Sequence, residues 1–246
     1  MRVGILGYGE IGSSLAKVYV NHTDYELLIK DLNRDDGLYA LDVLNICIPF
    51  KSTDQFVEAV SKQIAESQPK LTIVHSTVIP GTTNLIADLT EAKIVHSPVR
   101  GVHPNLYEGL MTFAKFIGAD DMDSEEAAIE HINSLGIETI SCSSARATEL
   151  GKMLSTTYYG VIIAWHAEMK EICDQMGVSF DEAVTMFNET YNEGYTELGK
   201  TNVVRPVLYP PNGPIGGHCV VPNAKLLNTL VDNDGVNLVL KYDSED

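Results

Sequence analysis

The stretch 2-RVGILGYGEIGSSLAKVYV-20 decides the fold. A short apolar strand leads into a glycine-rich turn, and the turn leads into a helix with apolar residues on one face. Gly7, Gly9 and Gly12 have GxGxxG spacing, which allows a tight turn, close approach of the backbone to a pyrophosphate, and close packing of helix on strand. Amides at a helix N-terminus attract phosphate oxygens. The stretch therefore predicts a dinucleotide-binding unit of the Rossmann type.

The second predicted strand, 25-YELLIKD-31, ends in an acidic residue. Asp31 follows the turn by about 20 residues, where a carboxylate accepts hydrogen bonds from the adenosine ribose and repels a 2′-phosphate. This position favours NAD over NADP as the cofactor. The alternative is that the glycines serve only packing and that Asp31 is a solvated strand end.

Strands and helices continue to alternate through the first half of the chain. Apolar runs bounded by proline, glycine or serine predict strands at 42–50, 71–77, 93–98 and 113–120, the last of the domain, with helices at 53–67 and 124–136. This alternation is typical of parallel strands, whose carboxyl ends bind ligands, so we expect Pro49, Thr77 and Pro98 at the nicotinamide end. The residues predicted to contact NAD are Gly7, Tyr8, Gly9, Glu10, Ile11, Gly12, Asp31, Pro49 and Thr77.

The second half of the chain is predicted to be mainly helical. Residues 145–177 contain no proline and have apolar residues at helical spacing, and a helix of that length measures about 45 Å. Such a helix commonly connects two domains or forms a subunit contact, so we expect a homodimer. A second helix is predicted at 180–190, and 232–246 is expected to be solvated beyond its apolar middle. We predict an α/β fold with a Rossmann-type parallel-sheet domain over 1–140 and a helical domain over 141–246.

Composition limits the partners. The formal charge of −17 argues against nucleic acid and anionic membrane surfaces, because both would repel the chain. The four cysteines lie far apart, without metal-ligand spacing, so we expect reduced thiols, no zinc site and a cytoplasmic protein. The N-terminus lacks a signal-peptide pattern and no apolar run is long enough to span a membrane. An anionic small-molecule substrate would need local positive charge or a helix N-terminus.

Two side chains in the second half are candidates for chemistry. Lys152 lies on the long predicted helix, where a cleft would either lower its pKa or let it donate to an oxygen; the alternative is a solvated helix lysine. Cys219 lies in 213-GPIGGHCVVPN-223, where Gly216 and Gly217 leave backbone room and His218 would lower the pKa of the thiol when charged. The alternative is a small buried cysteine.

Six segments together resemble the UDP-glucose/GDP-mannose dehydrogenase family, and especially its UDP-N-acetylmannosamine dehydrogenase branch. They are 7-GYGEIG-12, 46-ICIP-49, 76-STVIPGT-82, 97-SPVR-100, 149-ELGKMLSTTYYG-160 and 213-GPIGGHC-219. Their order and approximate spacing agree with the family from residue 1 to about 225. In that family a third domain binds the nucleotide of the substrate, and we expect this chain to lack it.

The resemblance implies a reaction and a set of roles. The family oxidises a primary alcohol of a nucleotide sugar to a carboxylate in two NAD-dependent steps through a cysteine thiohemiacetal. By position, Cys219 is the nucleophile, Lys152 the cation that stabilises the alkoxide, and Thr77 a hydroxyl that positions water.

Three positions depart from the family pattern. The family's glutamate after the proline of the segment matched by 97-SPVR-100 is Val99 here. Its asparagine four residues beyond the lysine is Thr156, and its aspartate four residues beyond the cysteine is Asn223. Asn223 cannot take a proton at neutral pH, so alcohol oxidation should survive these changes more readily than thioester hydrolysis. Glu108 or His103 is a candidate to compensate.

We therefore expect an NAD-dependent oxidoreductase acting on a sugar or sugar nucleotide. Two alternatives remain open. A β-hydroxyacid dehydrogenase also places a lysine on the first long helix and needs no cysteine. An NAD-binding subunit without catalysis would rely on a partner chain to complete its substrate site, and Val99 and Asn223 favour that reading.

Overall fold

The computed structural model describes residues 1–101, 105–217 and 219–244, which form two compact units, Met1–Lys152 and Met153–Asp246. Unit 1 is built on a sheet in the order β3-β2-β1-β4-β5-β6-β7-β8. Its central strands are parallel: β1 (Arg2–Leu6), β2 (Glu26–Asp31), β4 (Val43–Ile46), β5 (Leu71–Val74) and β6 (Ile94–His96). The predicted alternation is confirmed for this part of the sheet.

The two ends of the sheet differ from the prediction. β3 (Arg34–Asp35) runs antiparallel to β2, and β7 (Lys115–Gly118) runs antiparallel to β6. β8 (Thr139–Cys142) then pairs parallel with β7, so the expectation that 113–120 is the last strand is wrong. The apolar run of a buried strand does not encode its direction, which explains why the sequence pattern missed the reversal.

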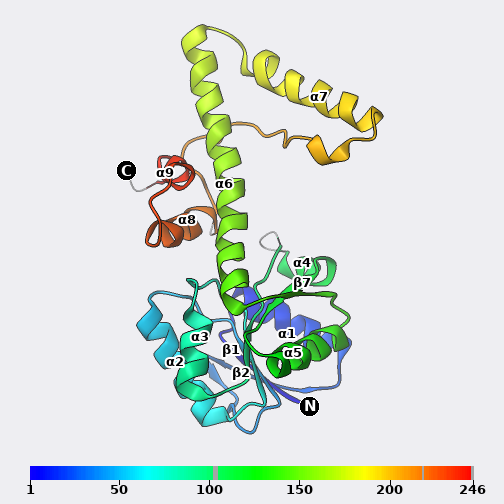
Figure 1. Cartoon of the computed structure of the whole chain (residues 1–246), viewed down its shortest axis with the longest axis vertical. Helices are drawn as coiled ribbons and strands as arrows, with labels where there is room; N and C mark the ends of the chain where they lie inside the picture. Colours follow the sequence, from blue (N-terminus) through cyan, green and yellow to red (C-terminus); the bar gives the residue numbers. More distant parts are fainter. Residues whose placement is uncertain (102–104, 218, 245–246) are drawn as a thin grey trace. The chain divides into compact units, whose positions relative to one another are not determined.

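Helices cover both faces of the sheet, as Figure 1 shows. On one face lie α2 (Thr53–Ser67) and α3 (Thr82–Thr90), which pack Phe56, Val60 and Ile86 against β4 and β5. On the other lie α1 (Glu10–His22), α4 (Leu106–Thr112) and α5 (Met122–Ser134), which contribute to a second core with β1. The sheet is therefore buried on both sides, and its strand ends are the edges open to ligands.

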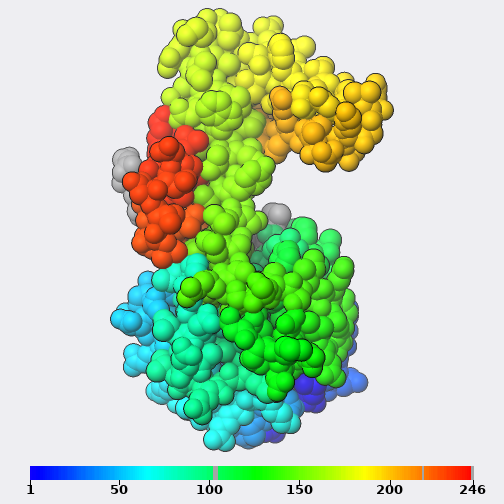
Figure 2. Space-filling model, in the orientation of Figure 1, coloured from blue at the N-terminus to red at the C-terminus, as the bar shows by residue number. Residues whose placement is uncertain are grey.

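Unit 2 is mainly helical. It contains most of α6 (Ala145–Met176), a π-helical turn (Asp181–Thr185) that continues as α7 (Met186–Glu197), a 3₁₀ turn (Thr201–Val203), α8 (Val220–Asn228) and α9 (Asp234–Leu240). α8 and α9 pack side by side on α6, as the orange and red segments of Figure 2 show. Gly160 permits this packing, because a Cβ there would lie 2.6 Å from Val220 Cγ1. α6 confirms the long helix predicted from the sequence.

None of the helices in the described ranges is both long and apolar enough to cross a membrane.

The first turns of α6 are anchored to the sheet domain by a buried carboxylate. Glu149 is fully buried, and its two oxygens accept hydrogen bonds from the backbone N–H groups of Gly81 (2.6 Å) and Thr83 (2.8 Å) at the start of α3. Burial raises the pKa of Glu149, against the effect of these hydrogen bonds. The contact satisfies amides that α3 leaves unpaired at its N-terminus.

We predict that Glu149→Gln lowers the free energy of unfolding by about 1–3 kcal/mol, because the new NH₂ group cannot accept a hydrogen bond and a buried amide loses its partner. Urea denaturation at neutral pH measures this. Glu126→Gln, at an exposed position on α5, is the matched control and should change stability little. Equal effects of the two substitutions would contradict the anchoring role.

Candidate functional site

The glycine turn after β1 has the geometry that its sequence predicts. Gly7 has φ +95° and donates its N–H to Lys30 O at 2.8 Å, so the turn reaches the neighbouring strand β2. A Cβ on Gly12 would lie 1.9 Å from Gly7 O, which means that helix and turn pack too closely for any side chain there. Gly9 differs, since a Cβ on it would meet nothing within 4 Å. The surface over Gly9 is therefore open to a ligand.

Asp31 lies at the end of β2 beside this turn. Its carboxylate accepts hydrogen bonds from the backbone N–H groups of Tyr8 and Leu32. Arg34, which no sequence motif indicates, pairs with Asp36 through a 2.7 Å contact from Nη2 to Oδ2. Its guanidinium lies 5.7 Å from the Tyr8 ring centroid. An arginine near this acid is the group that would accept a 2′-phosphate, but its charge here is neutralised by Asp36.

Pro49, Thr77 and Pro98 follow the neighbouring parallel strands β4, β5 and β6. They therefore share the carboxyl edge of the sheet with the glycine turn. A hydrogen bond from Ser76 Oγ to Ile48 O (2.6 Å) ties together the segments after β4 and β5. Pro98 is buried, Thr77 is half-buried and Pro49 is exposed, so this edge presents partly accessible groups above a closed core.

The segment after β6 is held by cations. Lys152 Nζ donates to Val99 O at 2.9 Å, which places its ammonium at the backbone of the position where the family has glutamate. Lys115 Nζ, on β7, donates to Ser97 O at 2.8 Å and lies 3.3 Å from Pro98 O. Lys115 was not predicted from the sequence, because a lysine within a predicted strand is ordinarily a solvent-facing residue. Lys152 is thus not a solvated helix lysine.

Two buried histidines complete this edge. His75 lies 3.0 Å from Ser97 O through Nδ1 and 2.9 Å from Asn45 Oδ1 through Nε2. His96 lies 2.8 Å from Thr148 Oγ1 through Nδ1. Burial lowers the pKa of His96 to about 3 and takes the pKa of His75 well below its ordinary value. Both rings are neutral at physiological pH, so the positive charge at this edge belongs to lysine and arginine.

The remaining predicted catalytic residues, Cys219, Asn223 and Thr156, lie in unit 2. Cys219 is the half-buried residue that precedes α8, and Asn223, which is buried, donates its backbone N–H to Cys219 O at 3.1 Å. Thr156 is half-buried on α6. His103 and His218 lie outside the described residues, and Glu108 is exposed on α4. Lys152, the lysine half of the candidate site, therefore belongs to unit 1, whereas Cys219, the cysteine half, belongs to unit 2.

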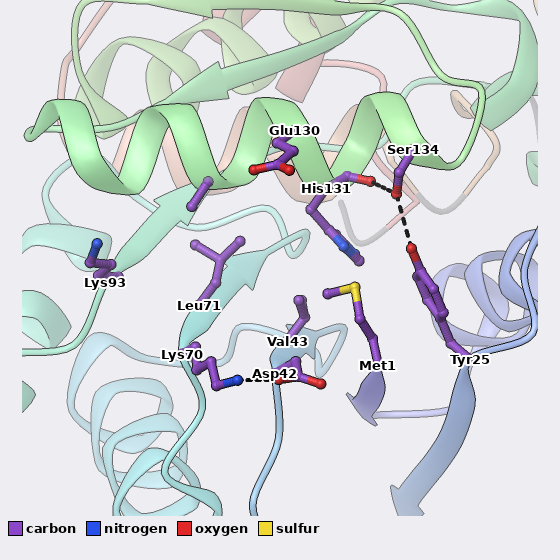
Figure 3. A pocket seen from close by; sticks show the side chains of 11 residues that line it. Met1, Tyr25, Asp42, Val43, Lys70, Leu71, Lys93, Glu130, His131 and Ser134 are labelled. Atoms are coloured by element: carbon purple, nitrogen blue, oxygen red, sulfur yellow. Dashed lines mark hydrogen bonds and ion pairs between the residues drawn. The ribbon is translucent and has the colours of Figure 1, made fainter.

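A pocket of about 450 Å³ lies at the opposite, amino edge of the sheet, between α5 and the starts of β4 and β5 (Figure 3). Lys70 and Asp42 form an ion pair at its rim with a 2.7 Å contact. His131 points from α5 toward Met1 and Tyr25, and burial lowers its pKa to about 4. The pocket contains none of the predicted site residues. Over the described ranges, His, Cys, Asp and Glu side chains form no cluster of three that could hold a metal ion.

Comparisons with known proteins identify relatives of the chain. It is 27% identical over 224 residues to a UDP-N-acetyl-D-mannosamine dehydrogenase of Methanocaldococcus jannaschii, which covers 80% of this chain and 49% of the relative. The UDP-D-ManNAc dehydrogenase of Pyrococcus horikoshii has the same fold, with a TM-score of 0.78 at 21% identity over 99% of this chain and 68% of that chain.

A Mycobacterium tuberculosis 3-hydroxyisobutyrate dehydrogenase also shares the fold, with a TM-score of 0.72 at 15% identity over 98% of this chain and 91% of that chain. No model of a protein family matches the chain. The chain spans about half the length of the curated relatives it matches. Relatives that carry the same name and cover 72–89% of the chain confirm the resemblance seen in its motifs. The chain is therefore a homologue of the UDP-N-acetyl-D-mannosamine dehydrogenases.

Proposed function

We propose that the chain is an NAD-dependent oxidoreductase that oxidises the primary alcohol of a sugar nucleotide. One observation carries this proposal: three groups lie along one edge of the sheet. They are the open surface over Gly9 after β1, the half-buried Thr77 after β5, and the ammonium of Lys152, which contacts the segment after β6. Relatives named for this activity support the substrate class.

The residues present fit the cofactor. The open face of Gly9 leaves room for a pyrophosphate, and the N-terminal amides of α1 offer it a partial positive charge. Asp31, whose carboxylate lies beside the glycine turn, would accept hydrogen bonds from the ribose. NAD, when bound, accepts a hydride from the substrate carbon. In this proposal Lys152 donates a hydrogen bond to the substrate oxygen as it becomes an alkoxide, and Thr77 orients a water molecule.

Cys219 would act after the first oxidation. Its thiolate would attack the aldehyde carbon and the carbonyl oxygen would take up a proton, which gives a thiohemiacetal. Loss of the hydroxyl proton, with a hydride passing from the same carbon to a second NAD, would then give a thioester, and water would cleave this to the carboxylic acid and the free thiol. Asn223 can hydrogen-bond that water but cannot remove its proton. We therefore expect the first oxidation to be retained more fully than the release of an acid.

The second candidate function is that of a β-hydroxyacid dehydrogenase. The fold that the chain shares with the 3-hydroxyisobutyrate dehydrogenase supports this candidate. That chemistry uses a lysine and no cysteine. A third candidate is an NAD-binding subunit without turnover, which the residues Val99 and Asn223 favour. The three differ in what they predict for Cys219 and for turnover.

Two glycine substitutions separate cofactor binding from stability. Gly9→Ala adds a methyl group in open space, so we expect an unfolding free energy within about 0.5 kcal/mol of wild type but at least tenfold weaker NAD binding, because the methyl occupies the pyrophosphate position. Gly12→Ala forces a methyl against Gly7 O and should destabilise the fold by about 1–3 kcal/mol or more. Calorimetry and urea denaturation measure the two effects. Unchanged NAD affinity in Gly9→Ala would place the cofactor elsewhere.

Turnover is tested by incubating the protein with NAD and a panel of UDP-sugars and following reduced nicotinamide by absorbance, with products resolved by mass spectrometry. We expect aldehyde and acid from wild type and no acid from Cys219→Ser, because the serine hydroxyl is a far weaker nucleophile than a thiolate. Cys173→Ser, at a buried cysteine in unit 2, is the control. Full activity of Cys219→Ser on a hydroxyacid would favour the second candidate, and tight NAD binding without any turnover would favour the third.

We also propose that the chain is a homodimer through α6 and α7. α7 buries none of its side chains against the described chain. Phe187 on α7 and Met176 on α6 are each 70% exposed. Phe187→Glu combined with Met176→Glu should therefore yield a monomer in sedimentation analysis, because a buried charge opposes association. Leu89→Glu, at an exposed position on α3, should leave the dimer intact. A wild-type monomer at micromolar concentration would refute this assembly.

A further inference from the structure

Lys115 is a buried lysine without an acidic partner. Its side chain lies on β7 and is 3% exposed. Its ammonium donates to backbone carbonyls, Ser97 O at 2.8 Å and Pro98 O at 3.3 Å, and none of the ion pairs within the described ranges includes it. Carbonyl dipoles compensate a buried charge less fully than a carboxylate does. A charge in this position costs stability, so its retention calls for a functional reason.

Within the described ranges, the titratable groups close enough to Lys115 to interact with its charge come from several elements. Cys47 follows β4, His75 follows β5, Arg100 lies in the segment after β6, and Lys152 is on α6, while His96 lies within β6. Burial raises the pKa of the Cys47 thiol to about 12, so it carries no charge at neutral pH. Both histidines are neutral because burial lowers their pKa values. Among the residues that the structure describes, the charged groups that act on Lys115 are therefore two cations, Lys152 and Arg100.

Lys115 and Lys152 bind successive carbonyls of one segment. Lys115 holds the carbonyls of Ser97 and Pro98, and Lys152 holds that of Val99. Two like charges at such close sites titrate as a coupled pair, and the proton leaves first from the more buried group. Lys115 is the more buried of the two, since Lys152 is only half-buried. Arg100 keeps its charge throughout, because a guanidinium does not deprotonate in this range.

We propose that Lys115 is a positioning residue for Lys152: its hydrogen bonds fix the carbonyls of Ser97 and Pro98 so that Val99 O meets the Lys152 ammonium. This inference rests on the role of Lys152 in the proposed function. A neutral amine still donates hydrogen bonds to the two carbonyls, so the segment keeps its shape when the proton is lost. Burial first, and then the charges of Lys152 and Arg100, lower the pKa of Lys115 to about 7.

The test follows lysine side chains by NMR in the full chain labelled with ¹³C at lysine Cε, without substrate or cofactor. Lys115→Met and Lys152→Met assign the two signals. We expect the Lys115 signal to titrate near pH 7 rather than near its ordinary value of 10.5. Lys115→Met should move the Lys152 titration to lower pH, because the segment that carries Val99 O is released and the Lys152 ammonium loses a hydrogen bond that favours its charged form. Lys115→Arg, which keeps the charge, should move the Lys152 titration to lower pH.

If Lys115 only filled space in the core, Lys152 would titrate at the same pH in Lys115→Met as in wild type. A Lys152 titration that stays in place or moves up in Lys115→Met overturns the proposal. Denaturation provides a second readout. Because the pKa of Lys115 is lowered by folding, wild type should gain stability relative to Lys115→Met as pH rises from about 7 to about 10 and show a constant difference below pH 7. These measurements need no turnover, so their failure is distinct from failure of the proposed activity.

Discussion

The position of Lys152 in the candidate site depends on one contact: the Glu149 carboxylate accepts hydrogen bonds from the backbone amides at the start of α3. It is fully buried and accepts two backbone hydrogen bonds, so it determines both the position and the rotation of the first turns of α6. Lys152 lies one turn further along the same helix and therefore reaches the carbonyl of Val99. The close approach of Gly118 to Thr148 Oγ1 adds a second constraint, since a Cβ on this glycine would lie 2.3 Å away.

Most of the sheet and the long helix are predictable from sequence because both follow simple periodic patterns. The glycine turn is predictable for a stronger reason, since Gly7 and Gly12 occupy positions that exclude a side chain. The direction of β7 and the existence of β8 are not predictable, because a buried apolar run has the same composition in either orientation. The helices α8 and α9 are not predictable from the sequence either, for a different reason. They are short, and their stability comes from packing on α6 around Gly160 rather than from their own propensity.

The candidate site is predictable where chemistry requires a residue type at an accessible position, and it is hidden where burial changes that chemistry. Asp31, Thr77 and Lys152 are visible in the sequence because they follow strand ends or a helix pattern. Lys115 and His75 are not, because their role arises from side chains and carbonyls brought together by neighbouring strands. A polar residue in the interior usually satisfies its own hydrogen bonds. Here the carbonyl of Ser97 receives contacts from both side chains, which is a property of the tertiary structure alone.

Two of the three departures from the family pattern, Val99 and Asn223, bear on different steps of the proposed reaction. Val99 contributes its backbone carbonyl to Lys152, a contact that any side chain would allow, so the loss of glutamate removes an acid–base group without removing the anchor of the lysine. Asn223 donates its backbone N–H to the carbonyl of Cys219, so the two residues lie one helical turn apart. An amide at that place can order water but not ionise it. If the thiol forms the adduct, the second half of the reaction therefore depends on hydroxide or on another base, and the rate of acid release should rise with pH more steeply than that of alcohol oxidation.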